Sequence, residues 1–385
     1  MSHVVVIGAG ITGLATAHAL ARDGIAVTLV DAYGPAAMAS GWTLAGVRQS
    51  GRDPAELPLA REAVALWATL DEELDAPTGY RRSGNLRLAR DAQEAQRIAA
   101  LVKEQSAVGL EISLVEGDDL RALAPALSPE IVCASHCPSD GQAEPLAVAR
   151  AYRDAGERLG VRFRFGTPVT GIDCTGGRFR ALETADGPIA GDACLVAAGI
   201  GAPGLLAPLG LDLPLRTPLV TMALSEKVAP CLDQVLGTAS ANVAARQQAD
   251  GRLRVSSGIL PWDGALTHDD QGHPRASPDA ATLSGMLMRV AEVLPAFATT
   301  PVERFWGGVI DLTPDALPVL GPVPGIAGLH VASGFSGHGF CLGPVTGRIM
   351  RDLLLGREQE RDLAAFAFTR FREGAPATAP LTLHG

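Results

Sequence analysis

The chain has 385 residues, of which 47% are apolar and 19% charged, and its formal net charge is −10. This length is enough for two domains with separate cores. The acidic balance and the absence of any Lys/Arg block argue against a nucleic-acid partner. No uninterrupted apolar run reaches the roughly 18 residues that a membrane-spanning helix needs, so the sequence predicts no membrane span.

The N-terminus and the cysteines predict a cytoplasmic protein without a metal site. The apolar N-terminal run has no basic leader and continues directly into a glycine turn, so we expect a strand there rather than a signal peptide. Six cysteines in a chain of this size, without a secretion signal, are typical of reduced thiols. The closest pair, Cys133 and Cys137, has no second ligand pair at zinc or iron–sulfur spacing.

The segment between Val4 and Asp31 predicts a strand, a glycine turn, a helix and a second strand. The apolar runs Val4–Ile7 and Val27–Val30 are the expected strands, and Gly24 is the expected stop of the helix between them. This arrangement is that of a dinucleotide-binding unit.

Within this unit, Gly8, Gly10 and Gly13 form a G-x-G-x-x-G pattern. The three glycines allow a tight turn, room for a pyrophosphate against bare backbone, and close packing of helix on strand. Asp31 ends the second strand, where a carboxylate can accept hydrogen bonds from ribose hydroxyls. The strand, the helix and this acid together make the pattern specific for a dinucleotide.

The remainder of the chain alternates between helical and strand-like segments. Helices are predicted at Ala55–Leu74, Asp91–Val108, Pro145–Leu159, Ala280–Leu294 and Leu342–Leu355. Strands are predicted at Asn85–Ala89, Arg162–Phe165, Val169–Asp173, Arg178–Thr184, Cys194–Ala197, Arg252–Ser257 and His330–Ala332.

This order predicts an α/β fold with an α+β second domain. We expect a discontinuous, Rossmann-like nucleotide-binding domain at residues 1–82, 144–212 and 306–374. A substrate domain built on an antiparallel β-sheet is expected at residues 83–143 and 213–305. The tail after about Gly374 is expected to fray.

A second glycine loop, Ser336-Gly337-His338-Gly339, lies between a predicted buried strand and a predicted helix. Backbone N–H groups and the helix dipole favour negative charge at such a position. Reduced flavin carries negative charge at its N1/C2 carbonyl edge, so this loop is suited to stabilise the product of hydride transfer.

With both glycine loops, the chain resembles the D-amino-acid-oxidase-like family of FAD-dependent amine oxidoreductases. Within that family it is most similar to the branch of the sarcosine oxidase β-subunit, opine oxidase and hydroxyproline dehydrogenase. The resemblance covers nearly the whole chain and is carried by Gly8–Gly13, Ala39–Arg48, Val169, Ala197–Gly199, Thr313-Pro314-Asp315 and Phe335–Phe340.

The resemblance implies noncovalent FAD and a set of residues that contact it. Monomeric sarcosine oxidases attach flavin through a cysteine at the position that Gly308 occupies here, so no thioether is expected. The implied cofactor contacts are Gly8, Ala9, Gly10, Ile11, Thr12, Gly13, Asp31, Ala39, Ser40, Gly41, Val169, Ala197, Ala198, Gly199, Gly308, Ser336, Gly337, His338, Gly339 and Phe340.

Two residues that bind the substrate carboxylate in related enzymes are missing here. Ile310 stands at the position of an arginine, and Cys341 at that of a lysine. Arg48 is therefore the candidate for contacting substrate or flavin, with Arg52 in reserve. His338 is the second catalytic candidate, to bind flavin or substrate or to orient backbone. Cys341 is expected to be a packing residue rather than a reactive thiol.

The resemblance implies oxidation of the C–N bond of a secondary or N-substituted amino acid, such as sarcosine, a hydroxyproline or an opine. An imine would form by hydride transfer to flavin N5. The electron acceptor stays open between oxygen and electron-transferring partner subunits. Three alternatives also stay open: a D-amino-acid dehydrogenase or deaminase acting on primary amines, a non-catalytic flavin-binding subunit, and an NAD-binding dehydrogenase.

Overall fold

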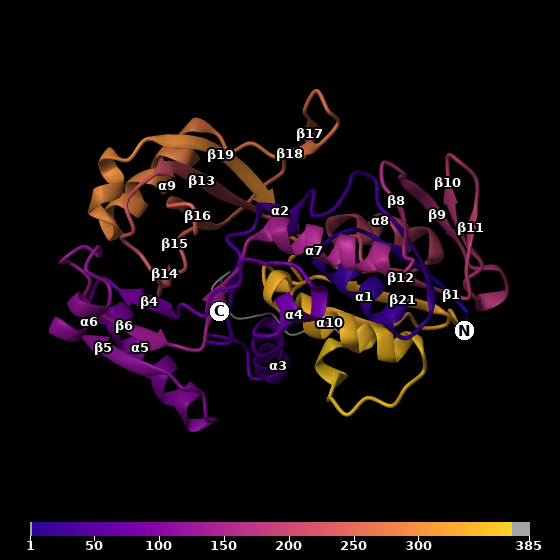
Figure 1. Ribbon diagram of the computed structural model, residues 1–385, viewed down its shortest axis with the longest axis horizontal. Coiled ribbons are helices and arrows are strands. Elements are labelled where there is room, and N and C mark those ends of the chain that lie inside the picture. The colour runs from indigo at the N-terminus through magenta and orange to yellow at the C-terminus, as the bar shows by residue number, and fades with distance from the viewer. Residues whose placement is uncertain (1, 372–385) are drawn as a thin grey trace.

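Two β-sheets lie side by side in the computed structural model, which describes residues 2–371 (Figure 1). Residues 372–374, at the end of the predicted FAD-binding segment, and the tail after Gly374 lie outside the described residues. None of the helices in residues 2–371 is long and apolar enough to cross a membrane.

The first sheet has six strands in the order β20-β21-β12-β1-β2-β8. All neighbours are parallel except β20 and β21. Strands of a parallel sheet are buried on both faces, which explains apolar runs such as Val4–Ile7. The strands are β1 (His3–Ile7), β2 (Ala26–Val30), β8 (Arg162–Arg164), β12 (Ala193–Val196), β20 (Val319–Pro322) and β21 (Leu329–Ser333).

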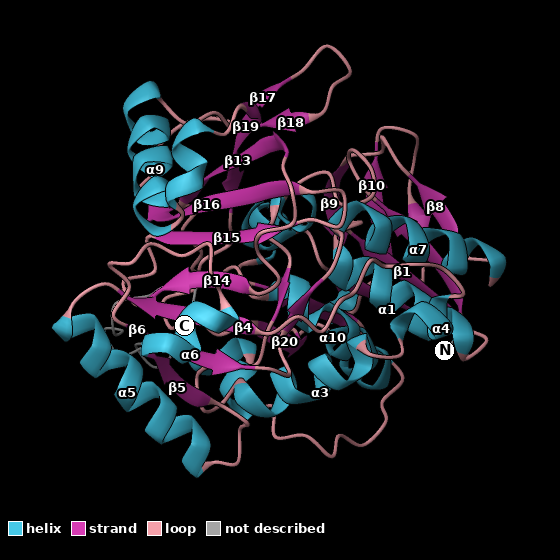
Figure 2. Ribbon diagram, turned by 60° about the vertical axis from the view of Figure 1, so that its left-hand side comes forward, coloured by secondary structure: helices cyan, strands magenta, loops and turns pink. Residues whose placement is uncertain are grey.

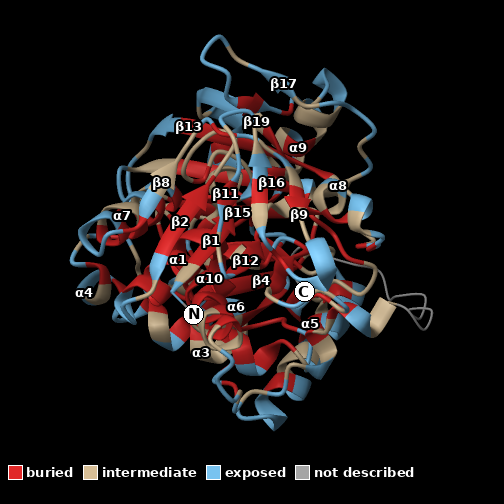
Figure 3. Cartoon of the chain, turned by 90° about the vertical axis from the view of Figure 1, so that its right-hand side faces the viewer, coloured by how far each residue is buried: buried red, intermediate tan, exposed pale blue. Residues whose placement is uncertain are grey.

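Other elements cover both faces of this sheet, and its strands are buried (Figure 3). Val4 and Val6 of β1 face a core shared with α1, α3, α7 and α10, whereas Val5 and Ile7 face one shared with α8 and a small sheet of β9, β10 and β11. These elements are α1 (Ile11–Arg22), α3 (Leu57–Trp67), α4 (Leu70–Leu74), α7 (Pro145–Arg158), α8 (Ala202–Leu206), α10 (Gly339–Leu354), β9 (Val169–Asp173), β10 (Ala181–Thr184) and β11 (Ile189–Ala190).

Helices α1 and α10 approach each other closely because α10 presents glycines at the crossing. A Cβ atom at Gly347 would lie 2.7 Å from the carbonyl carbon of Ala15, and one at Gly343 would lie 2.6 Å from the Ile11 side chain. Since both helices also begin at glycine loops, this packing brings their N-termini to the same side of the first sheet.

The second sheet has eight strands in the order β19-β13-β16-β15-β14-β4-β6-β5 (Figure 2). The strands are β4 (Asn85–Ala89), β5 (Ser113–Glu116), β6 (Cys133–Cys137), β13 (Leu219–Lys227), β14 (Val235–Thr238), β15 (Val243–Gln247), β16 (Arg252–Leu260) and β19 (Val302–Val309). Helices α6 (Gly117–Leu123) and α9 (Ala280–Val293) pack on one face, and α5 (Ala92–Ala107) packs against β4 and β6 on the other.

Two excursions of the chain build this sheet, and a parallel ladder between β4 and β14 joins them. The expectation of an antiparallel sheet is therefore correct for every neighbouring pair except this one. The pairing is parallel because the connection between the two strands passes through α7 and β12 of the first sheet.

Shorter elements connect the two sheets. They are α2 (Ala39–Trp42), β3 (Gly46–Val47), β7 (Gly141–Gln142), β17 (Thr267–His268) and β18 (Pro274–Arg275). β3 and β7 form one antiparallel pair, and β17 and β18 form another.

Some predicted boundaries differ from the structure. The helix expected over Ala55–Leu74 is two helices, α3 and α4. The strand expected from Arg178 begins only at Ala181, because Arg178 makes an isolated bridge to Ala327 instead. The expected domain boundary between residues 305 and 306 falls inside β19, which pairs with β13 on both sides of it.

Helix α10 begins at Gly339, three residues before the predicted start at Leu342. Glycine disfavours a helix interior, but tertiary packing outweighs that preference here. Phe340 is buried and its ring centroid lies 5.2 Å from that of Trp67 on α3.

Candidate active site

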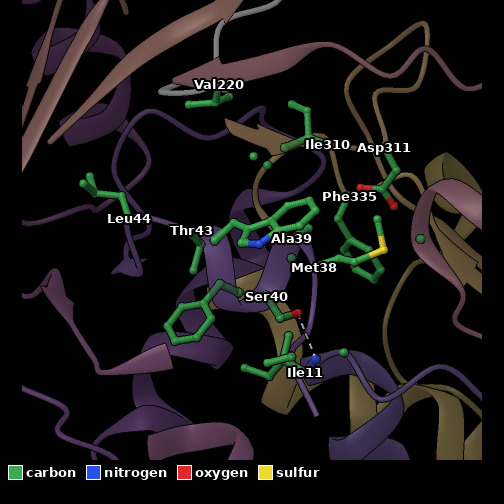
Figure 4. A pocket seen from close by; sticks show the side chains of 18 of the residues that line it. Ile11, Met38, Ala39, Ser40, Thr43, Leu44, Val220, Ile310, Asp311 and Phe335 are labelled. Atoms are coloured by element: carbon green, nitrogen blue, oxygen red, sulfur yellow. Dashed lines mark hydrogen bonds between the residues drawn. The ribbon is translucent and has the colours of Figure 1, made fainter. Parts of the chain in front are cut away.

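A pocket lies between the two sheets and receives residues from both (Figure 4). Its wall on the side of the first sheet includes Gly8, Gly10, Ile11, Thr12, Asp31, Tyr33, Ala39, Ser40, Ala197, Ala198, Gly199, Gly337, Gly339 and Phe340. Its wall on the side of the second sheet includes Asn85, Arg87, Val220, Met222, Val235, Leu236, Gly237, Ser256, Gly308, Val309 and Ile310.

The first glycine loop brings bare backbone to the pocket. Gly8 has φ +107°, and a Cβ atom there would lie 2.3 Å from the Ala197 carbonyl oxygen. A Cβ atom at Gly13 would lie 1.9 Å from the Gly8 carbonyl oxygen. Because the glycines allow these close backbone contacts, β1, α1 and β12 pack tightly together. Gly10 and the N-terminus of α1 then line the pocket.

The N-terminus of α1 is open to an anion. Gly10 supplies no side-chain cap, and the first turn of the helix carries no acid. The Ile11 N–H donates to Oγ of Ser40 at 3.0 Å (Figure 4), which shows that its N–H groups point towards the α2 loop. This cradle fits a pyrophosphate, which helix N-termini bind through their N–H groups and dipole.

Asp31 lines the pocket beside the N-terminus of α1. Its Oδ2 accepts the Ala9 N–H at 2.7 Å, and its Oδ1 accepts the N–H groups of Tyr33 and Gly34 at 2.7 and 2.9 Å. Burial raises the pKa of Asp31, although these three bonds act in the opposite direction. The carboxylate shapes the turn as well as lining the pocket, and its remaining lone pairs are available for the ribose hydroxyls that the sequence suggested.

The second glycine loop is held in place by Asp311. Oδ2 of Asp311 accepts the Gly334 N–H at 2.7 Å, and its carbonyl oxygen accepts the Ser336 N–H at 3.0 Å. Ser336 adopts φ +56°, a strained value for a residue with a side chain. The loop therefore presents Gly337 and Gly339 to the pocket.

Helix α10 starts at this loop without a side-chain cap and without an acid in its first turn. Two helix N-termini, those of α1 and α10, thus face one pocket. The donor set fits FAD, whose pyrophosphate and flavin pyrimidine edge both carry negative charge.

Three buried arginines form a cationic wall at the junction of the two sheets: Arg48, Arg52 and Arg87 all line the pocket. Burial lowers the pKa of Arg48 well below its ordinary value, and the charges of Arg52 and Arg87 lower it further. Burial and Arg52 lower the pKa of Arg87 to about 10. These effects show three like charges within range of one another, which an anion would stabilise.

A buried network fixes the position of Arg52. Its Nε lies 3.3 Å from Oε1 of Glu56, and Oε2 of Glu56 lies 3.0 Å from Nδ1 of His338. Burial alone would raise the pKa of Glu56, but His338 and Arg52 outweigh it, so the pKa is lowered. Burial and Arg52 lower the pKa of His338, which favours a neutral ring donating from Nδ1 to an ionised Glu56.

The loop that carries Arg48 is held from two sides. Oδ1 of Asp140 accepts the Gln49 N–H at 2.8 Å, and Oδ2 accepts the Ser50 N–H at 3.3 Å. On the other side, the Arg48 N–H donates to Sγ of Cys341 at 3.2 Å, and this thiol donates back to the Arg48 carbonyl oxygen at 3.4 Å. Burial raises the pKa of Cys341 to about 11, so the thiol is protonated near neutral pH and acts as a structural contact.

The structure brings most of the sequence-predicted residues into the pocket wall. They are Gly8, Gly10, Ile11, Thr12, Asp31, Ala39, Ser40, Arg48, Ala197, Ala198, Gly199, Gly308, Gly337, Gly339 and Phe340. The reserve candidate Arg52 lines the wall as well.

Six predicted residues lie outside the wall: Ala9, Gly13, Gly41, Val169, Ser336 and His338. Ala9, Gly13 and Ser336 shape the two glycine loops, as described above. A Cβ atom at Gly41 would lie 2.1 Å from the Ala36 carbonyl oxygen, so this glycine shapes the α2 loop. Val169 is half-buried on β9, and His338 lies behind the wall against Glu56.

Arg87 is a pocket residue that the sequence reading missed. In β4, Leu86 and Leu88 point into the core with α9, whereas Asn85 and Arg87 point to the opposite face and line the pocket. The period-two alternation was visible in the sequence. The sequence did not show which face of β4 lines a pocket, because that depends on the pairing of β4 with β14.

Comparisons with known proteins agree with this site. The model of the DAO family, described as FAD dependent oxidoreductase, matches residues 3–353. A D-amino acid dehydrogenase of Cereibacter sphaeroides is 25% identical, over 96% of this chain and 95% of its own. A sarcosine oxidase subunit beta of an Arthrobacter species is 26% identical, over 96% of this chain and 91% of its own.

The fold is also that of a solved relative. The crystal structure of glycine oxidase from Geobacillus kaustophilus superposes with a TM-score of 0.89 at 24% identity, covering 96% of this chain and 99% of that chain. This chain belongs to the DAO family and is an FAD-dependent amine or amino-acid oxidoreductase.

Proposed function

We propose that this protein oxidises the C–N bond of a secondary or N-substituted amino acid, of the sarcosine, hydroxyproline or opine type, to an imine. The observation that carries the proposal is the cationic wall of Arg48, Arg52 and Arg87, set at the junction of the two sheets next to the loop of Gly337 and Gly339. A carboxylate bound there lies beside the expected flavin position. When bound, FAD supplies at N5 the acceptor for the hydrogen and two electrons that leave the substrate carbon.

Arg52 is well placed to bind the substrate carboxylate. Its side chain is 3% exposed, and its Nη1 has no hydrogen-bond partner among the described residues. An unsatisfied buried guanidinium nitrogen is costly unless a ligand pairs with it. Glu56 fixes the other side of the guanidinium, and His338 fixes Glu56, so His338 acts in this proposal as a positioning residue.

The wall favours a neutral amine. Its carboxylates among the described residues are Asp31 and Asp311, and both accept hydrogen bonds from backbone N–H groups of the surrounding loops. An ammonium group would have no counter-ion beside the arginines. The neutral nitrogen keeps the lone pair that forms the new C=N bond, and the N–H proton of a secondary amine passes to solvent.

An apolar surface supports an N-substituted substrate. Val220, Met222 and Ile310 pack together and line the pocket on the side of the second sheet. An N-alkyl group or a pyrrolidine ring buries apolar surface there. A primary D-amino acid is the competing substrate class, since a D-amino acid dehydrogenase is among the relatives.

Anaerobic mixing of the FAD-loaded protein with single amines tests this function. We expect sarcosine, N-ethylglycine or a hydroxyproline to bleach the visible flavin absorbance, and D-alanine to do so much more slowly. Faster bleaching by D-alanine would favour the competing class. A flavin that no member of either group reduces would contradict an oxidase or dehydrogenase of this kind.

We also propose that the electrons leave through a partner subunit, because one relative is named as a subunit of sarcosine oxidase. The isolated chain should then reduce an artificial dye faster than oxygen. The measurement is hydrogen peroxide formed per substrate oxidised in air, with the dye absent and present. Peroxide at the full rate without a dye would contradict the partner.

A further inference from the structure

We propose that Arg254 and Trp306 of the second sheet are positioning residues that hold helix α2 in the conformation in which it lines the FAD pocket. The inference concerns the cofactor, so it stands whichever amine the protein oxidises. Three observations support it: the weakness of α2 by itself, the hydrogen bonds at its C-terminal end, and the surroundings of the two side chains that donate them.

Helix α2 cannot maintain its own conformation. It has four residues, and none of them is buried. Met38, which precedes it, supplies no side-chain cap. Isolated helices shorter than roughly 12–15 residues are marginal in water, because nucleation costs more than one turn of hydrogen bonds returns. The conformation of α2 therefore depends on groups outside the helix.

The position of α2 matters for the cofactor. Ala39, Ser40 and Trp42 all line the pocket. Oγ of Ser40 also accepts the Ile11 N–H at 3.0 Å, at the N-terminus of α1 (Figure 4). That N-terminus is the expected site of the pyrophosphate. A displacement of α2 would therefore change both the pocket wall and the anion site beside it.

Two side chains of the second sheet donate to the last carbonyl groups of α2. Nη2 of Arg254 donates to the Gly41 carbonyl oxygen at 2.9 Å, and Nε1 of Trp306 donates to the Trp42 carbonyl oxygen at 3.2 Å. The last carbonyl groups of a helix have no partner within it and need one from elsewhere. These two bonds join the C-terminal end of α2 to β16 and β19.

Arg254 is 5% exposed and makes no ion pair among the described residues. Its guanidinium carbon lies 4.9 Å from the centroid of the Trp306 ring, and its Nε has no hydrogen-bond partner in the described part of the chain. Burial and the charge of Arg246 lower the pKa of Arg254 to about 9, against the opposing charge of Glu144, so the group is charged at neutral pH. The bond to Gly41 and the stacking on Trp306 offset the cost of burying this charge.

Trp306 connects α2 to the apolar wall of the pocket. Its ring packs against the cluster of Val220, Met222 and Ile310, and all three of these residues line the pocket. Strand β19, which carries Trp306, also packs directly against α2. The second sheet therefore fixes the ring, and the bond from Nε1 transmits that position to α2.

Hydrogen exchange of the holoenzyme at saturating FAD tests whether these residues hold α2. The N–H groups of Gly41 and Trp42 donate to the Met38 carbonyl oxygen at 2.8 and 3.0 Å, so their exchange reports whether the turn is formed. We expect Arg254→Met and Trp306→Phe to raise the exchange rate in residues 38–44 about tenfold or more, with wild-type rates in β13. Unchanged exchange in residues 38–44, or equally faster exchange in β13, would overturn the proposal.

The rate of FAD release after dilution of the holoenzyme tests the consequence for the cofactor. Arg254→Met should release FAD about tenfold or more faster than the wild type. Arg254→Lys keeps a charged donor for the Gly41 carbonyl oxygen, so its rate should lie between the two. If Arg254→Met does not fold, Arg254→Lys and Trp306→Phe carry the same test. A wild-type rate in both of these variants would overturn the proposal.

Arg304→Met is the matched control. Arg304 also lies over the Trp306 ring, at 5.3 Å, but it is exposed and makes no hydrogen bond to α2 within the described residues. It should release FAD within about threefold of the wild-type rate, because an exposed stacking contact contributes little. Equal rates in Arg254→Met and Arg304→Met would overturn the role of Arg254.

A double-mutant cycle tests whether the two side chains act through one element. Either single change already frees the end of α2, so Arg254→Met combined with Trp306→Phe should release FAD about as fast as the faster single variant. Effects on the release rate that multiply in the double variant would overturn a shared action through α2.

Discussion

Replacing Gly13 by alanine should yield a protein that retains less than about a tenth of the wild-type FAD after purification. The added Cβ atom would lie 1.9 Å from the Gly8 carbonyl oxygen, and both partners belong to the backbone. No rotamer change can relieve this overlap, so α1 has to move away from β1. That movement removes the helix N-terminus from the pocket. The ratio of visible flavin absorbance to protein absorbance after gel filtration measures the loss.

Gly204→Ala is the matched control for this experiment. Gly204 lies in α8, has no atom of another residue within 4 Å of a built Cβ, and is absent from the pocket wall. Alanine at such a helical position is neutral or slightly stabilising. Wild-type FAD content in Gly13→Ala would show that the helix N-terminus does not hold the cofactor.

Replacing Glu56 by glutamine should destabilise the protein by about 3–5 kcal/mol at neutral pH, because it leaves Arg52 as a buried charge without its carboxylate. Glu56 is 0% exposed and contacts both Arg52 and His338. The same change frees the guanidinium to rotate, so KM for the substrate should rise as well. Urea unfolding followed by circular dichroism, together with steady-state kinetics, measures the two effects.

The direction of the Glu56 pKa shift determines how the stability difference between wild type and Glu56→Gln depends on pH. The pKa of Glu56 is lower in the folded protein than its ordinary value, so its stabilising contribution is present above the unfolded-state pKa of about 4.3 and is lost as the pH falls through the folded value. The difference in unfolding free energy between wild type and Glu56→Gln should therefore stay constant between pH 7 and about 5, and shrink as the pH is lowered below about 4.

The matched control for Glu56 is Glu62→Gln. Glu62 pairs with Arg361 in a half-exposed ion pair, with distances of 2.6 and 2.8 Å. Exposed pairs of this kind contribute less than about 1 kcal/mol. If Glu56→Gln cost no more than Glu62→Gln, the buried network would not be what holds Arg52.

Local patterns were enough to predict five strands of the first sheet, but not β20 (Val319–Pro322) or the order of the strands. The apolar runs at Val4–Ile7 and Val27–Val30, with glycines after the first, depend only on neighbours in the sequence. Helix α5 was predicted from its amphipathic pattern. In the structure, Asp91 caps it by accepting the Glu94 N–H. The parallel pairing of β4 with β14 could not be predicted, since two strands so far apart leave no signal in either segment.

The residues of the site also fall into those that local sequence predicted and those that it did not. The glycine loops and Arg48 were identified from motifs, because glycine is needed where backbone approaches backbone. The contact between Glu56 and His338 could not be predicted, because it arises where α3 packs against α10. Arg87 was not identified, although the strand that carries it, Asn85–Ala89, was predicted. Its burial depends on the two excursions forming one sheet.

The ladder between β4 and β14 has a consequence for how the protein is made. Its register joins Asn85 to Val235, so 150 residues separate the paired positions. At about 5–20 residues per second, β4 leaves the ribosome roughly 8–30 s before its partner exists. During that interval β4 can pair with β6 but presents its other edge unpaired, which is a template for association with other chains. The substrate half of the pocket is therefore completed late in synthesis, and the free edge of β4 needs protection until β14 has been made.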